Sequence, residues 1–323
     1  MKKYGLLMAM TKNLGDDIQS LAAKQFLPGI DVFLERDFLN RVNFTKNIRV
    51  IMNGWFTHHP ENWPPSPKIE PLFISFHIAP HVADKMLSKK TIEYLKKYEP
   101  IGCRDEHTKK LLEKIGVNAY FSGCLTLTLD HGYGHLKDQK NSLGLLVVDL
   151  DKDVLKYLPK RVLRNSFVTS HSYFDTSKIL QKIVPLSLRK IVRRMSLVNN
   201  NVKKMLYVID RYRSGKISVE TRLRVAEEQL QRLANTQLLI TSRLHAALPA
   251  IAFGVPVIFV HRNLNDPRFT GLLKYMNHYS IFEFKKHVNE IDWENPPRNP
   301  LQGEVKELKR NLIKKCQEFI EDV

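Results

Sequence analysis

Three short stretches of the sequence place charged or polar side chains directly after apolar runs. They are NLGDDIQ (13–19), CRDEH (103–107) and TSRLHAALPAIAFGVP (241–256). In open α/β sheets ligands bind outside the carboxyl ends of the strands, which is where such residues would lie. Cationic side chains beside the free N–H groups of a helix start bind anions. The stretches therefore predict an anion site.

The first stretch supplies one candidate catalytic residue and three candidate binding residues. Gly15 permits a tight turn, and Asp16 or Asp17 could simply cap the helix that follows. A capping aspartate at a strand end also faces the cleft, so Asp16 is a candidate base. We expect Asn13, Gly15 and Asp17 to bind substrate.

The second stretch contains Arg104, which follows a predicted strand. Asp105 and Glu106 begin the next helix, where acids suit the helix dipole. A cation at this position is unfavourable unless it holds an anion or forms a salt bridge with one of those acids. Both alternatives stay open, and Arg104 is a candidate substrate-binding residue.

The third stretch contains Arg243 and His245 at a strand-to-helix corner. If the chain is extended there, the two side chains point the same way. An arginine forks onto an anion, and a histidine titrates near neutral pH, so Arg243 is a binding candidate and His245 a catalytic acid. We expect Pro249 near the first turn of the helix and Gly254 at its end.

Alternating apolar runs and helical periodicity predict an α/β protein with parallel sheets. We expect two Rossmann-like domains facing a central cleft, over 1–135 and 143–323, joined by a polar linker at 131–142. Strands are predicted at 4–10, 32–35, 48–54, 72–77, 101–104, 119–123, 143–150, 166–171, 205–210, 237–242 and 255–260. Helices are predicted at 16–26, 89–98, 106–116, 221–235 and 246–254.

One long loop, at 58–71, contains five prolines and is predicted to be neither helix nor central strand. It is either a stiff surface loop or a rim over a pocket, with Trp55 and Trp63 as platforms for a sugar ring. His77, at the end of the following strand, is a further candidate for substrate binding.

Composition restricts the cellular location and the kinds of site expected in this protein. The 323 residues carry a net charge of +18, and the three cysteines show no CxxC spacing. We therefore expect a reducing, cytoplasmic location, no metal site and no disulfide framework. The apolar start of the chain is interpreted as a strand, not an export signal, and no apolar run is long enough to span a membrane.

The basic charge is concentrated at 178–216, where a helix within 179–198 would be amphipathic. It either packs on its own domain or docks peripherally on an anionic membrane face. Nucleic acid is the weaker candidate partner, because no zinc finger or RNA-binding aromatic motif accompanies the charge.

The sequence resembles the polysaccharide pyruvyl transferase family. The resemblance lies in NLGDDIQSLAAKQFLP, in PIGCRDEHTKKLLEKIGVNAYFSGCLTL and in ANTQLLITSRLHAALPAIAFGVPVIFV, in the right order and spacing. It implies a fold similar to GT-B glycosyltransferases. It also implies transfer of pyruvate from phosphoenolpyruvate to a sugar, as a ketal, with release of phosphate and no cofactor.

The resemblance also carries residue roles. It assigns the family's functional positions to Asp16, Arg104, Arg243 and His245, and less closely to Arg268. This chain has GDD where many members have GDE or GN, which leaves the role of Asp17 less secure. The acceptor would be a sugar of a surface polysaccharide, such as a capsule, or its lipid-linked precursor.

Two other functions fit the same features. A nucleotide-sugar glycosyltransferase of GT-B type would also place basic groups at an interdomain cleft, but would more often show a carboxylate or glycine-rich loop for the nucleotide. A non-catalytic basic binding protein on the same fold is the alternative outside the enzymes, based on the charge at 178–216.

Overall fold

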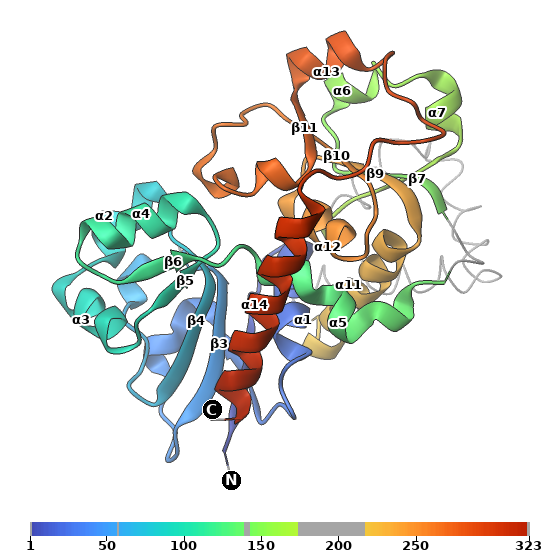
Figure 1. Cartoon of the computed structure of the whole chain (residues 1–323). Coiled ribbons are helices and arrows are strands. Elements are labelled where there is room, and N and C mark those ends of the chain that lie inside the picture. Colours follow the sequence, from blue (N-terminus) through green and yellow to red (C-terminus); the bar gives the residue numbers. More distant parts are fainter. Residues whose placement is uncertain (1, 57, 139–142, 174–216, 322–323) are drawn as a thin grey trace, which may run out of the picture.

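The computed structural model describes residues 2–56, 58–138, 143–173 and 217–321, and its strands form two parallel sheets (Figure 1). The first has the order β2-β1-β3-β4-β5-β6 and the second β11-β10-β9-β7-β8. The first sheet consists of β1 (Tyr4–Met8), β2 (Val32–Glu35), β3 (Ile48–Trp55), β4 (Ile69–His77), β5 (Ile101–Cys103) and β6 (Ala119–Phe121). The second consists of β7 (Leu143–Val148), β8 (Ser166–Thr169), β9 (Thr236–Thr241), β10 (Val257–His261) and β11 (Asn277–Ser280).

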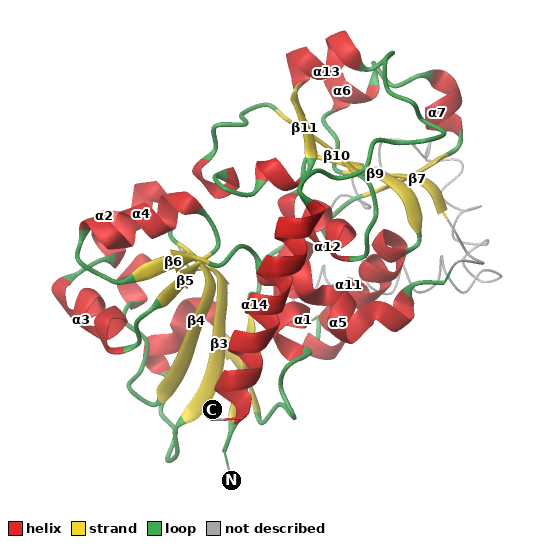
Figure 2. Ribbon diagram, viewed as in Figure 1, coloured by secondary structure: helices red, strands yellow, loops and turns green. Residues whose placement is uncertain are grey.

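Helices alternate with these strands and cover the sheets (Figure 2). The α-helices are α1 (Leu14–Lys24), α2 (Ala83–Met86), α3 (Lys89–Lys97), α4 (Glu106–Lys114), α5 (Leu129–Tyr133), α6 (Lys152–Leu155), α7 (Lys160–Arg164), α11 (Val219–Ala234), α12 (Leu244–Ala252), α13 (Ile281–His287) and α14 (Gln302–Glu321). The 3₁₀ turns are η1 (Arg36–Arg41), η2 (Pro60–Asn62), η3 (Pro80–Val82), η4 (Leu125–Thr128), η5 (Gly134–Leu136), η7 (Pro267–Phe269) and η8 (Leu273–Tyr275). The fold is α/β with two Rossmann-like halves in a GT-B-like arrangement, as the sequence predicts.

A continuous apolar core joins the two halves. It combines Leu6 and Ile18 of the first half with Leu230 and Leu248 of the second, all fully buried. The last helix, α14, returns to the first half (Figure 1). There Arg49 lies 4.4 Å over the ring of Phe319. The predicted boundary between the two domains, at residues 135–143, stays a prediction. Helix α14 belongs by sequence to the second domain but packs on the first half.

Most predicted strands are confirmed to within a few residues. Three other features differ from the prediction: a loop, a linker and one additional strand. The loop prediction for 58–71 is wrong at its end, because β4 begins at Ile69 and Pro71 pairs with Val50 of β3. Proline is tolerated there because β5 pairs with β4 only further along, at Phe76. The linker predicted from 131 begins later, since α5 and η5 occupy 129–136. β11 is a strand that the sequence did not indicate.

Two predictions lie outside the described residues: the strand at 205–210 and the helix within the basic segment 179–198. Within the described part of the chain, no helix is both long and apolar enough to cross a membrane.

Candidate active site

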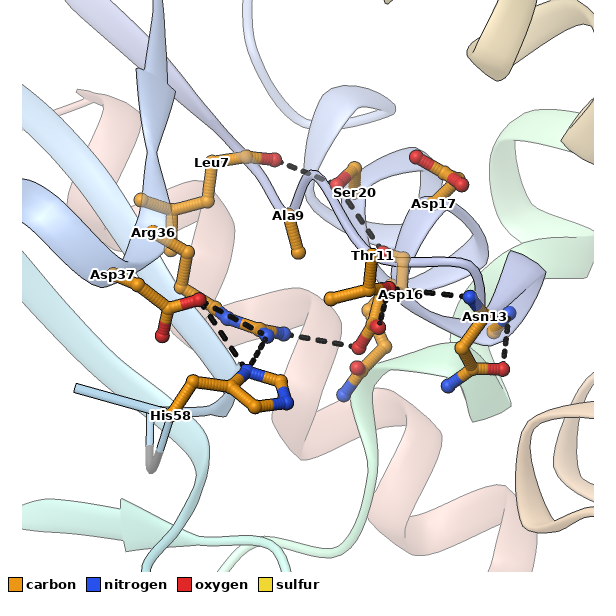
Figure 3. Close-up of polar contacts among 12 residues, drawn as sticks. Leu7, Ala9, Thr11, Asn13, Asp16, Asp17, Ser20, Arg36, Asp37 and His58 are labelled. Carbon is orange, nitrogen blue, oxygen red and sulfur yellow. Dashed lines mark hydrogen bonds and ion pairs between the residues drawn. The ribbon is translucent and has the colours of Figure 1, made fainter. Parts of the chain in front are cut away.

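Asp16 lies at the start of α1, behind the carboxyl end of β1, in a buried polar cluster (Figure 3). Its Oδ1 accepts a hydrogen bond from Arg36 at 2.9 Å, and its Oδ2 accepts one from the Thr11 hydroxyl at 2.5 Å. Arg36, 4% exposed, also contacts Nδ1 of His58 at 3.3 Å. Both carboxylate oxygens of Asp16 are therefore engaged by neighbouring donors.

The charge state of Asp16 follows from these partners. Burial alone would raise the pKa of Asp16, but the charge of Arg36 and the hydrogen bonds from Thr11 and Arg36 hold the pKa below its ordinary value. Asp16 is thus ionised at neutral pH and is a weak proton acceptor. Beside it lies a small cavity, lined in part by Gln19, Arg36 and Asn53.

Gly15 of α1 contacts His245 of α12. A Cβ built on Gly15 would lie 3.0 Å from Cβ of His245 and 3.1 Å from its Nδ1. Gly15 is part of the helix and has no left-handed φ, so the tight turn expected from the sequence is wrong. A glycine is needed here because the histidine of the other half packs against it.

His77 and Arg104 lie side by side at the ends of β4 and β5. Phe76 pairs with Cys103, so the next residue of each strand is a neighbour in the sheet. Arg104 is 2% exposed. Its Nε forms an ion pair with Oδ2 of Asp105 at 3.6 Å, which is longer than a hydrogen bond, so the salt bridge left open by the sequence is present. Among the described residues, neither its Nε nor one of its terminal nitrogens has a hydrogen-bond partner.

The two histidines near Arg104 are held neutral by their surroundings. Burial and then the charge of Arg104 lower the pKa of His77 to about 4 and that of His245 to about 3. In the described structure Nε2 of each ring is buried without a hydrogen-bond partner. Buried polar atoms are normally paired, so these two ring nitrogens and the incompletely paired guanidinium mark a candidate binding site.

His245 occupies the first turn of α12, and Pro249 lies in the second turn, not the first as predicted. Proline has no N–H for the carbonyl four residues earlier, which is that of His245. Nε2 of the buried His171 donates to this carbonyl at 3.1 Å instead. Gly254, at φ +77°, ends the segment as predicted.

Arg243 caps α12 with an extended backbone, and its Nε donates to the Asp149 carboxylate at 2.8 Å. Asp149 lies at the end of β7 with φ +45°, an uncommon backbone conformation for a non-glycine residue. Its Oδ2 also accepts from the backbone N–H of His171 at 3.1 Å. Asp149 thus fixes the half-exposed Arg243 at the entrance to the corner.

A family model described as "Polysaccharide pyruvyl transferase" matches residues 13–263, a range that includes Asp16, His77, Arg104 and His245. This chain belongs to the polysaccharide pyruvyl transferase family. The transferase therefore moves a pyruvyl group to polysaccharide, in the general sense that the family name states. No curated protein matches the chain in sequence. The matched range ends before Arg268.

Three predicted site residues of the transferase bind other side chains or the chain itself. Asp17 accepts from Nε and a terminal nitrogen of Arg222, both at 2.9 Å, and points away from the Asp16 contacts (Figure 3). Arg268, 45% exposed, forms an ion pair with Asp266 at 2.6 Å. Asn13 caps α1 by accepting from the backbone N–H of Gly15 at 3.1 Å. Substrate contacts by these residues stay predictions.

The two tryptophans of the transferase differ in position. Trp63, also half-buried, packs on the core rings of Phe56 and Phe76, with centroids 5.5 Å away in both cases. Trp55 is half-buried at the end of β3 and lies 4.8 Å from the ring of the exposed His58. A sugar platform at either ring stays a prediction.

Sequence reasoning missed Arg36, Asp149 and His171. Arg36 and Asp149 follow β2 and β7, so the signal that found Arg104, a charge just past a buried strand, could have found them too. His171 ends the predicted strand 166–171 and lies two residues past β8, so a polar residue at a strand end could have indicated it as well. Among the described residues, no three His, Cys, Asp or Glu side chains group as a metal site would require.

Proposed function

We propose that this protein transfers pyruvate from phosphoenolpyruvate to a sugar of a surface polysaccharide or of its lipid-linked precursor. The product is a ketal, formed with two hydroxyls of the sugar, and inorganic phosphate is released. The observation that carries this proposal is the buried guanidinium of Arg104, two of whose nitrogens lack a hydrogen-bond partner among the described residues. Phosphoenolpyruvate offers a carboxylate and a phosphate, and a guanidinium binds either as a fork.

His245 is proposed as the acid that protonates the methylene carbon and so makes the neighbouring carbon electrophilic. The imidazole of His245 is neutral in the structure because burial and Arg104 lower its pKa. A bound phosphate and carboxylate would oppose the effect of Arg104 and raise the pKa of His245, since negative charge favours the protonated ring. The donor itself would therefore prepare His245 to deliver a proton.

The acceptor is proposed to approach from the Asp16 side. Within the described structure, the amide of Gln19 and Nε of Arg36 are buried there without partners, and both residues line the small cavity beside Asp16. Sugar hydroxyls could pair with such groups. With its oxygens held by Arg36 and Thr11, Asp16 would orient a hydroxyl and offset developing positive charge.

The test combines binding and turnover. Isothermal titration with phosphoenolpyruvate is compared for wild type, Arg104→Met, His245→Ala and the exposed-arginine control Arg262→Met. Phosphate release is then measured with a panel of p-nitrophenyl glycosides, and the ketal is identified by mass spectrometry. We expect Arg104→Met to abolish binding and His245→Ala to keep binding while lowering turnover ~10²–10⁴-fold.

The stability of these variants separates function from structure. Removing an incompletely paired buried charge should leave the free energy of unfolding of Arg104→Met unchanged or raised. Wild-type binding of phosphoenolpyruvate by Arg104→Met, or turnover of a nucleotide sugar instead, would refute the proposed donor.

A further inference from the structure

His77 and Asp105 form a buried pair that the roles above leave unused. Nδ1 of His77 lies 2.6 Å from Oδ2 of Asp105, and both side chains are fully buried. The other oxygen of Asp105 accepts from the backbone N–H of Thr108 at 2.9 Å and from its hydroxyl at 2.8 Å. The carboxylate is therefore fixed by the helix start that it caps, and it fixes the imidazole in turn.

This pair determines which ring nitrogen of His77 is available. An ionised carboxylate only accepts, so Nδ1 of the neutral ring carries the proton and Nε2 keeps its lone pair. In the described part of the chain, Nε2 is buried without a hydrogen-bond partner. An unpaired buried acceptor costs about 1–3 kcal/mol, which a histidine serving only the core would avoid.

The position of His77 beside Arg104 in the sheet connects the pair with the donor. His77 and Arg104 follow the paired residues Phe76 and Cys103, and the backbone N–H of Arg104 donates to the Phe76 carbonyl at 2.9 Å. An anion on the guanidinium would therefore lie next to His77. Asp16 is less suited to accept a proton, because Arg36 and Thr11 engage both of its oxygens.

We propose that His77 is a second proton-transfer residue of the reaction, with Asp105 as its positioning residue. This rests on the proposed function. Nε2 of His77 takes the proton of the first acceptor hydroxyl as that oxygen bonds to the electrophilic carbon. His77 then returns the proton to the bridging oxygen of the phosphate as the carbon–oxygen bond breaks.

Two histidines are sufficient to account for every proton transferred in the reaction. His245 gives a proton to the methylene carbon in the addition step and recovers one from the second hydroxyl as the ketal closes. The two hydroxyl protons thus end on the methyl group and on the released phosphate. No further acid, base, oxidant or reductant is required.

The first experiment uses the intact protein and needs no acceptor. Long-range ¹H–¹⁵N spectra of histidine-labelled protein are recorded during titration with phosphoenolpyruvate, and His77→Gln and His245→Gln assign the signals. We expect His77 to remain the neutral Nδ1–H tautomer while its Nε2 signal shifts, and His245 to move toward the protonated form. If His245 responds and His77 does not, the inference alone is overturned; if neither responds, the proposed function fails as well.

The second experiment measures turnover with the glycoside that wild type uses fastest. His77→Gln and Asp105→Asn should each lower kcat about 10²-fold or more, with little change in the affinity for phosphoenolpyruvate. Asparagine also caps helices well, so Asp105→Asn should fold. The matched control is His287→Gln, which breaks an exposed histidine–carboxylate pair with Glu290, 2.8 Å long, and should leave kcat unchanged. Wild-type kcat in a folded Asp105→Asn protein overturns the positioning role of Asp105.

Discussion

Gly15 and His245, far apart in the sequence, touch across the join of the two halves. A Cβ on Gly15 would lie 3.0 Å from Cβ of His245, closer than side chains normally approach. The helix that starts the first half thus determines where the imidazole of the second half lies. Gly15 therefore sets the position of the His245 side chain although it has no side chain of its own.

The substitution Gly15→Ala should separate activity from stability. Alanine favours the helix by up to about 1 kcal/mol, which offsets the cost of its contact with His245, so the free energy of unfolding should change little. The added methyl displaces His245, and small displacements of a reacting group can lower turnover ~10²-fold. Urea unfolding and phosphate release measure the two effects. Gly303→Ala, where a Cβ meets nothing within 4 Å, is the control, and equal activity in both variants would contradict the prediction.

The ion pair of Asp16 with Arg36 should give a pH-dependent stability. Because the pKa of Asp16 in the folded protein lies below its ordinary value of 3.8, the pair stabilises the fold above about pH 4. This contribution is lost as the pH falls below that value. In Arg36→Gln, burial dominates and raises the pKa of Asp16, so the fold loses stability as the pH rises.

The stability gap between wild type and Arg36→Gln should therefore widen from pH 3 to neutral pH, reaching about 3–5 kcal/mol. Urea unfolding across a pH series measures it. The control Arg41→Gln lies at the exposed end of the same turn. Its stability should differ from wild type by at most about 0.5 kcal/mol at every pH. A gap for Arg36→Gln that does not vary with pH would show that Asp16 is not held by this charge.

Two ion pairs join the same helices, α1 and α11, and should differ in strength. Asp17 pairs with Arg222 in the core, with side chains 0% and 2% exposed, whereas Lys24 pairs with Glu227 at 37% and 36% exposed. Asp17→Asn should cost about 3–5 kcal/mol, because it breaks a buried ion pair by removing one partner. Glu227→Gln should cost ~0–1 kcal/mol. Denaturant unfolding of both variants tests this, and similar losses would contradict it.

The hydrogen bond from His171 to the His245 carbonyl should depend on Pro249. His171→Ala leaves that carbonyl without a donor and should cost about 1–3 kcal/mol beyond the lost packing. In a Pro249→Ala background the new N–H can serve the carbonyl, so the same substitution should cost less. A double-mutant cycle of unfolding free energies measures the difference, and a coupling energy near zero would show that His171 does not replace the missing donor.

The sequence by itself determined the local elements and the ends of strands where chemistry would lie. Apolar runs such as IRVIMNG and QLLITS become β3 and β9, because alternating or continuous apolar patterns favour buried strands wherever the chain places them. Gly254 ends its helical segment at a positive φ, and glycine after a helical run is a local signal that the sequence itself carries. The short, polar strand β11, NHYS, carries no such pattern and exists because β10 offers an edge.

Only the tertiary structure decided which charges meet. Arg36 reaches Asp16 across 20 residues, Asp105 reaches His77 across 28, and Arg222 reaches Asp17 across 205. Adjacent aspartates consequently have different partners: Asp16 faces the polar cluster, while Asp17 fastens two helices together. The strand order of each sheet and the joining of the two halves fix these neighbours, because a side chain at a strand end is paired by whichever element lies beside it and not by its own local sequence.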